Sequence, residues 1–190
     1  PADLEKAPAK FTTLVSNSRN DKNLRYRLQV YIEDCVGCGV CVETCPTKDK
    51  SLVMVPLEEE RAAAENENVD FFEKLPDSWL DGNKIETIKG SQFLTPLFEF
   101  SGACAGCGET PYIKLATQLF GDRMIIANAT GCSSIYGGTF PVSPYAKNKE
   151  GKGPSWANSL FEDNAEYGFG MRLAVDTIRR QLLANINAAI

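Results

Sequence analysis

The chain has 190 residues, enough for one medium domain or two small ones, and 43% of them are hydrophobic, as in ordinary globular proteins. A formal net charge of −5 gives no reason to expect binding to nucleic acid or to an anionic membrane. Histidine is absent, which excludes a histidine-based triad, metal site or general base within these residues. No catalytic side chain is therefore assigned, and chemistry would have to come from a cofactor, a carboxylate, a lysine or another chain.

The first elements surround a run of cysteines. Residues 24–34 alternate in character and predict a strand, and residues 51–57 predict a second, short strand that Pro56 closes. Between them lies "CVGCGVCVETCPTKDK", residues 35–50. A strand, a cysteine loop, a short helix and a strand make up half of a ferredoxin-like unit, so we assign residues 1–57 to such a domain.

The cysteine run has the spacing of bacterial-type iron–sulfur proteins, Cys-x2-Cys-x2-Cys-x3-Cys-Pro. Its members are Cys35, Cys38, Cys41 and Cys45. Zinc is a weaker alternative, because four zinc-binding cysteines usually form two separated pairs, and a disulfide framework would need an oxidising compartment. In two-cluster ferredoxins the fourth cysteine of each run binds the other cluster. Either Cys45 closes a single cluster, or a partner run lies outside these residues.

A helix and a connector follow the ferredoxin-like segment. Residues 58–75 are rich in helix-forming residues and predict a solvated helix, and residues 76–97 are a turn-rich connector, so residues 58–97 separate the two halves.

From residue 98 the pattern is α/β. A helix is capped by Glu109 or Thr110 and ends at Gly121. A strand at 123–130 follows, then a loop with a short helix, then a long helix from about 159 to 183. We therefore expect residues 98–190 to be only part of an α/β domain, since one βαβ-like unit cannot bury both faces of its sheet.

Three more cysteines lie in the α/β half. Cys104 and Cys107 form a CxxC, and Cys132 follows a helix and a strand later. Loops that follow neighbouring strands meet at one edge of an α/β sheet, so three thiolates are expected to converge there. The alternatives are a zinc site that lacks one ligand, a redox-active CxxC, or buried cysteines. Glycines flank all three cysteines, which favours a cofactor or a cluster lying against the backbone.

The segments "SGACAGCGETPYIKLATQLFGDRMIIANATGCSSIYGG" and "GPSWANSLFEDNAEYGFGM" resemble pyruvate:ferredoxin (flavodoxin) oxidoreductases, which use thiamine diphosphate. The upstream "EDCVGCGVCVETCPTKDKSL" resembles the ferredoxin domain inserted in that family. The resemblance covers essentially the whole chain. It implies an internal piece that holds the end of the ferredoxin domain and the start of a thiamine-diphosphate domain, with the missing cluster ligands elsewhere.

The resemblance also implies roles for individual residues. One ferredoxin-type cluster would use Cys35, Cys38 and Cys41, and its partner cluster would use Cys45. A cluster next to the thiamine would use Cys104, Cys107 and Cys132. The implied cofactor-binding residues are Glu109, Gly131, Ser133 and Ser134. The family's motif for Mg2+ and diphosphate is not found here, so those ligands are expected outside this chain, and no coenzyme A site is assigned.

The implied activity is oxidative decarboxylation of pyruvate to acetyl-CoA and CO2, with electrons passing through three 4Fe-4S clusters to ferredoxin or flavodoxin. The resemblance further implies a cytoplasmic homodimer assembled with the remaining domains. This chain alone would relay electrons and support the cofactor. Three alternatives stay open: a 2-oxoacid oxidoreductase with another substrate, a standalone iron–sulfur electron carrier, and a zinc-binding interaction module built on Cys104, Cys107 and Cys132.

Overall fold

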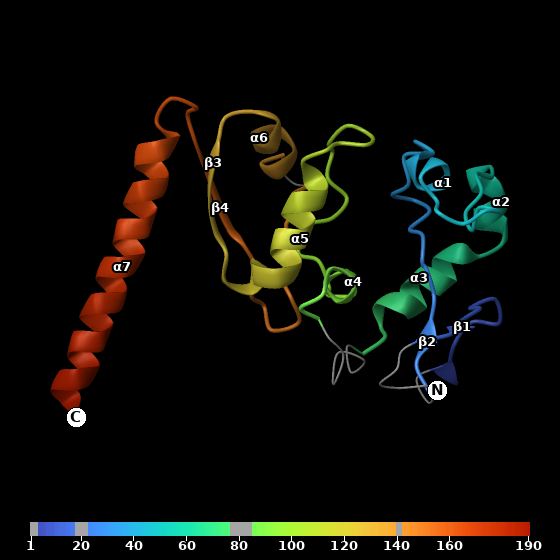
Figure 1. The fold of residues 1–190 in the computed structure, drawn as a ribbon, viewed down its shortest axis with the longest axis horizontal. Coiled ribbons are helices and arrows are strands. Elements are labelled where there is room, and N and C mark those ends of the chain that lie inside the picture. Colours follow the sequence, from blue (N-terminus) through green and yellow to red (C-terminus); the bar gives the residue numbers. More distant parts are fainter. Residues whose placement is uncertain (1–3, 18–22, 77–84, 140–141) are drawn as a thin grey trace. The chain divides into compact units, whose positions relative to one another are not determined.

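A computed structural model describes residues 4–17, 23–76, 85–139 and 142–190. The chain divides into two compact units, Pro1–Phe93 and Leu94–Ile190. Figure 1 shows the helices and the short strands of each unit. This mixture of helices with small sheets agrees with the expected fold class. The division falls within the expected connector, part of which, residues 77–84, lies outside the described residues.

The first unit is mostly loop and short helix. Strands β1 (Leu14–Val15) and β2 (Arg25–Tyr26) pair antiparallel. Helix α1 (Val40–Glu43) lies in the cysteine run, and α2 (Leu57–Ala62), α3 (Glu65–Glu73) and α4 (Ile88–Ser91) follow. The apolar core contains Phe11 and Ile32, and the ring of Phe11 meets the ring of Phe71 edge to face at 4.8 Å.

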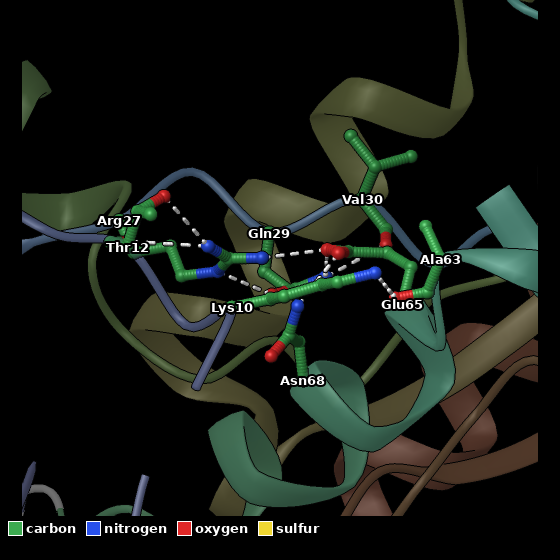
Figure 2. Close-up of polar contacts among 8 residues, drawn as sticks. All are labelled: Lys10, Thr12, Arg27, Gln29, Val30, Ala63, Glu65 and Asn68. Carbon is green, nitrogen blue, oxygen red and sulfur yellow. Dashed lines mark hydrogen bonds and ion pairs between the residues drawn. The ribbon is translucent and has the colours of Figure 1, made fainter. Parts of the chain in front are cut away.

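A polar cluster joins the segment before the cysteine run to α3 (Figure 2). The Glu65 carboxylate accepts hydrogen bonds from Arg27 at 2.6 Å, from Gln29 at 2.8 Å and from Asn68 at 2.7 Å. The Arg27 guanidinium also stacks 4.6 Å from the centre of the Phe11 ring. These contacts fix the chain that leads into the cysteines against α3, because charge-assisted bonds of this length are strong when partly buried.

The second unit contains a parallel pair of strands. Its elements are α5 (Thr110–Phe120), the 3-10 helix η3 (Gly121–Arg123), β3 (Ile125–Ala129), α6 (Cys132–Gly137), β4 (Ser155–Ser159) and α7 (Asn164–Ala189). Strands β3 and β4 align residue by residue, with Asn128 opposite Asn158. Helix α7 packs on β3, where Gly168 lies against Ala127. Phe98 and Tyr136 are buried, and their rings meet edge to face.

Several predicted elements are confirmed. Helix α5 begins after Glu109, carries Pro111 in its first turn and ends at Gly121. Strand β3 and the short helix α6 also occupy the predicted segments. Helix α7 begins at Asn164 rather than near residue 159 and ends at Ala189 rather than near residue 183. It continues through both of its glycines, because its packing on β3 outweighs their low helix propensity.

Other predicted elements are wrong. The strand at 24–34 shrinks to Arg25–Tyr26, and residues 51–55 form no strand, because no described neighbouring strand offers a ladder of backbone hydrogen bonds. The single helix at 58–75 is divided, since Ala64 adopts a left-handed conformation with φ of 58°. Strand β4 was not predicted.

Candidate functional site

The first three cysteines of the run lie on an open loop and on α1. Cys35, Cys38 and Cys41 are exposed and unbridged. Gly37 and Gly39 have φ of 66° and 73°, a left-handed conformation that glycine adopts without strain, and Gly39 caps α1. The backbone therefore turns twice between Cys35 and Cys41, as a loop that wraps a compact cluster must.

Cys45 has a different environment. It is half-buried, its sulfur lies 3.1 Å from Oγ1 of Thr47, and it accepts a hydrogen bond from the Ser51 amide at 3.3 Å. The hydrogen bond with Thr47 and then the one from Ser51 lower the pKa of the Cys45 thiol to about 6. Nζ of Lys50 donates to the carbonyl oxygen of Cys45 and holds the turn. Among the described residues, Cys45 is the one member of the run with such sulfur contacts, which fits a separate ligand role.

The CxxC of the second unit forms a turn before α5. The Cys107 amide donates to the Cys104 carbonyl at 3.0 Å, and Gly106 has φ of 70°. The Cys107 sulfur accepts from the Glu109 amide at 3.5 Å, and the amides of Glu109 and Thr110 lower the pKa of this thiol. The lowered pKa makes it easier for Cys107 to form the thiolate, which is the form that binds metal.

Cys132 is the first residue of α6, directly beyond the carboxyl end of β3. A polar network anchors this loop. The Ser134 hydroxyl accepts from the Gly131 amide at 3.0 Å and from Nδ2 of Asn128 at 3.1 Å. It lies 2.8 Å from both the Ala129 carbonyl and Oδ1 of Asn158, either of which can accept its proton. Ser134 therefore fixes the loop that carries Cys132.

The other predicted cofactor-binding residues lie at the start of α5 and beside Cys132. Glu109 is exposed at the start of α5, and Gly131 and Ser133 flank Cys132. Burial first, and then the Glu109 carboxylate, raise the pKa of Tyr136. The same two causes raise the pKa of Tyr145. Glu109 is thus close to two tyrosines that the sequence analysis did not assign to the site.

Within the described residues, no three cysteine or carboxylate side chains are close enough together to hold a metal ion. The seven cysteines therefore stay predictions. Their chemistry nevertheless fits iron–sulfur clusters: the thiols are unbridged, and the loop between Cys35 and Cys41 turns at glycines.

The sequence analysis missed Asn128, Asn158 and Tyr136. Asn128 lies near the carboxyl end of the strand predicted at 123–130, a position where α/β proteins place functional side chains, so the sequence contained a usable signal for it. Asn158 could not be found in this way because β4 was not predicted.

Comparison with known proteins identifies the relatives of this chain. Residues 28–48, which contain the whole cysteine run, match the family described as "4Fe-4S binding domain". The pyruvate:ferredoxin oxidoreductase of Moorella thermoacetica is 57% identical over 190 residues, which are 100% of this chain and 16% of that protein. The pyruvate-flavodoxin oxidoreductase of Nostoc is 52% identical over 93% of this chain and 15% of its own length.

A probable pyruvate-flavodoxin oxidoreductase of Escherichia coli is 54% identical over 96% of this chain and 16% of its own length. The chain is homologous to a segment of the pyruvate:ferredoxin and pyruvate-flavodoxin oxidoreductases. It spans about one sixth of the length of these oxidoreductases, which contain much more protein than these 190 residues. No helix among the described residues has both the length and the apolar character needed to cross a membrane.

Proposed function

We propose that this chain is the electron-relay and cofactor-supporting segment of an oxidoreductase that converts pyruvate and coenzyme A to acetyl-CoA and CO2. The observation that supports it most strongly is the 57% identity over the whole chain, which includes both cysteine groups. Three 4Fe-4S clusters carry the electrons to ferredoxin or flavodoxin. The enzyme acts as a cytoplasmic homodimer together with the domains that lie outside this chain.

In this proposal the ferredoxin run serves two clusters. Cys35, Cys38 and Cys41 bind one cluster, and Cys45 binds its partner. The separate hydrogen bonds at the Cys45 sulfur support this division, because they set Cys45 apart from the exposed thiols of the loop. Residues outside this chain complete both clusters.

The second cysteine group binds the third cluster, beside thiamine diphosphate. When bound with Mg2+, thiamine diphosphate supplies the electron sink for decarboxylation. Cys104, Cys107 and Cys132 hold the cluster next to it. Glu109, Gly131 and Ser133 face the cofactor, while Ser134 fixes the loop through its four polar neighbours. The ligands of Mg2+ and of the diphosphate lie outside these residues.

The first experiment measures iron, sulfide and zinc in the full-length protein isolated without oxygen. About twelve irons per copy, with matching sulfide, would support three cubane clusters. About four irons would favour a standalone electron carrier, and zinc without iron would contradict both functions.

The second experiment tests the substrate. Reduction of methyl viologen is measured with coenzyme A and with pyruvate, 2-oxoglutarate or a branched 2-oxoacid in turn. We expect rapid reduction with pyruvate and dependence on added thiamine diphosphate after the cofactor is removed. A preference for another 2-oxoacid would assign the chain to a related oxidoreductase.

A further inference from the structure

An ion pair lies at the entrance to the cysteine loop. The carboxylate of Glu33, two residues before Cys35, receives two bonds from Arg61 of α2: Nε donates at 2.9 Å and Nη2 at 2.6 Å. Both side chains are a little under half exposed, at 43% and 44%. Exposed pairs usually contribute little to stability, but a two-bond contact between arginine and a carboxylate is the geometry in which they contribute most.

The position of the pair suggests an electrostatic role. Two residues of extended chain span at most about 7 Å, so the backbone of Glu33 lies within about one Debye length of the backbone of Cys35. Reduction adds one negative charge to such a cluster. An unpaired carboxylate would make reduction less favourable, and an unpaired guanidinium would make it more favourable. In the pair, Arg61 offsets the Glu33 charge, while Glu58, which also pairs with Arg61, and Asp34, which precedes Cys35, add negative charge.

We propose that the Glu33–Arg61 ion pair controls the reduction potential of the cluster bound by Cys35, because Arg61 offsets the charge of the Glu33 carboxylate at the start of the cysteine loop. This inference rests on the proposed function, since it requires that cluster. Both residues act on the cluster through their charge, and neither is a ligand of it.

Each member of the ion pair has a second contact, so a substitution can change the charge of one residue while the other keeps its position. Without Arg61, Glu33 still accepts a hydrogen bond from Nδ2 of Asn66 at 3.0 Å. Without the Glu33 charge, Arg61 still donates to Glu58 at 2.8 Å. Arg61→Met therefore leaves Glu33 and Glu58 without their shared cation, and Glu33→Gln leaves Arg61 paired with Glu58 alone. The two variants change the local charge by one unit in opposite directions. Asn66→Ala removes an anchor of Glu33 without any change of charge.

The test is a potentiometric titration, monitored by electron paramagnetic resonance, of the oxygen-free full-length protein with its clusters. We expect Arg61→Met to shift the midpoint potential of one cluster to a more negative value and Glu33→Gln to shift it to a less negative value. The double variant should return close to wild type, and Asn66→Ala should leave the potential unchanged. Iron content should stay at the wild-type value in all four.

Unchanged potentials in both single variants would overturn the proposal. So would an equal shift in Asn66→Ala, which would assign the effect to geometry, or loss of iron from the single variants, which would assign a structural role. A wild-type protein without any iron–sulfur signal would instead contradict the proposed function, and this inference would fail with it.

Discussion

The side chains of Asn128 and Asn158 meet at the carboxyl ends of β3 and β4, where Nδ2 of Asn128 donates to Oδ1 of Asn158 over 2.8 Å. These asparagines are register partners in the parallel pair, and the Ser134 hydroxyl contacts both. The sheet edge is thereby tied to the loop that carries Cys132. The position of a predicted cluster ligand thus depends on strand pairing.

Ser134→Ala tests this connection. The substitution removes one acceptor and one donor from a half-buried network, and it leaves the Gly131 amide and Asn128 without one of their partners. We expect a loss of about 1–3 kcal/mol in the free energy of unfolding, measured by urea denaturation. The neighbouring Ser133→Ala is the control and should change it by less than about 0.5 kcal/mol. Equal effects of the two variants would contradict the network.

Glu65→Ala tests the polar cluster of the first unit. Arg27 and Glu65 keep only 11% and 19% of their side-chain surface exposed, so removal of the carboxylate leaves a mostly buried cation without its ion-pair partner. We expect a loss of about 2–4 kcal/mol in the free energy of unfolding, somewhat below the cost for a fully buried pair. The measurement is urea denaturation followed by circular dichroism.

Glu67→Ala is the matched control, because Glu67 is exposed in the first turn of the same helix. It should change stability by less than about 0.5 kcal/mol. A Glu65 variant as stable as the Glu67 variant would show that this cluster does not hold the segment against α3.

Local signals were enough to predict some of the structure. Pro111 and Gly121 mark the ends of α5, and an apolar run marks β3, because these elements follow preferences within a few residues. The cysteine spacing predicted the 4Fe-4S match for the same reason, since a cluster-binding loop is encoded in consecutive residues.

Elements fixed by distant contacts were not predictable. Strand β4 has the sequence "SWANS", whose asparagine and alanine are poor strand formers, and it becomes a strand by pairing with β3 about 30 residues earlier. Ala64 is a good helix former, yet it interrupts the helix with a positive φ. The bond between Arg27 and Glu65 joins residues 38 apart, which no local pattern reveals.

The ionisation of Tyr145 tests the surroundings of Glu109. Burial, followed by the Glu109 carboxylate, raises the pKa of Tyr145 above its usual value near 10. The native phenol keeps its proton at pH values where the unfolded one loses it. Its contribution to stability is therefore complete below about pH 10 and is lost as the pH rises through the native pKa.

The measurement is an absorbance titration near 295 nm. Tyr145→Phe should remove a late-ionising tyrosine, and Glu109→Gln should move that step to lower pH. Tyr112→Phe, at a tyrosine that is 76% exposed, should leave the late step in place. If Tyr145→Phe instead removed a tyrosine that ionises near pH 10, the predicted shift would be wrong.

Removal of single thiols distinguishes the two cysteine groups. In the oxygen-free full-length protein, Cys107→Ser should lower the iron content by about four atoms per copy, because a cubane that loses a thiolate ligand is expected to be lost. Both ferredoxin-type signals should remain in the electron paramagnetic resonance spectrum. Cys38→Ser should instead remove one ferredoxin-type signal and leave the thiamine-proximal cluster. Ser101→Ala, three residues before Cys104, is the control and should keep all the iron. If Cys107→Ser kept the wild-type iron content, the second cysteine group would not be a cluster site.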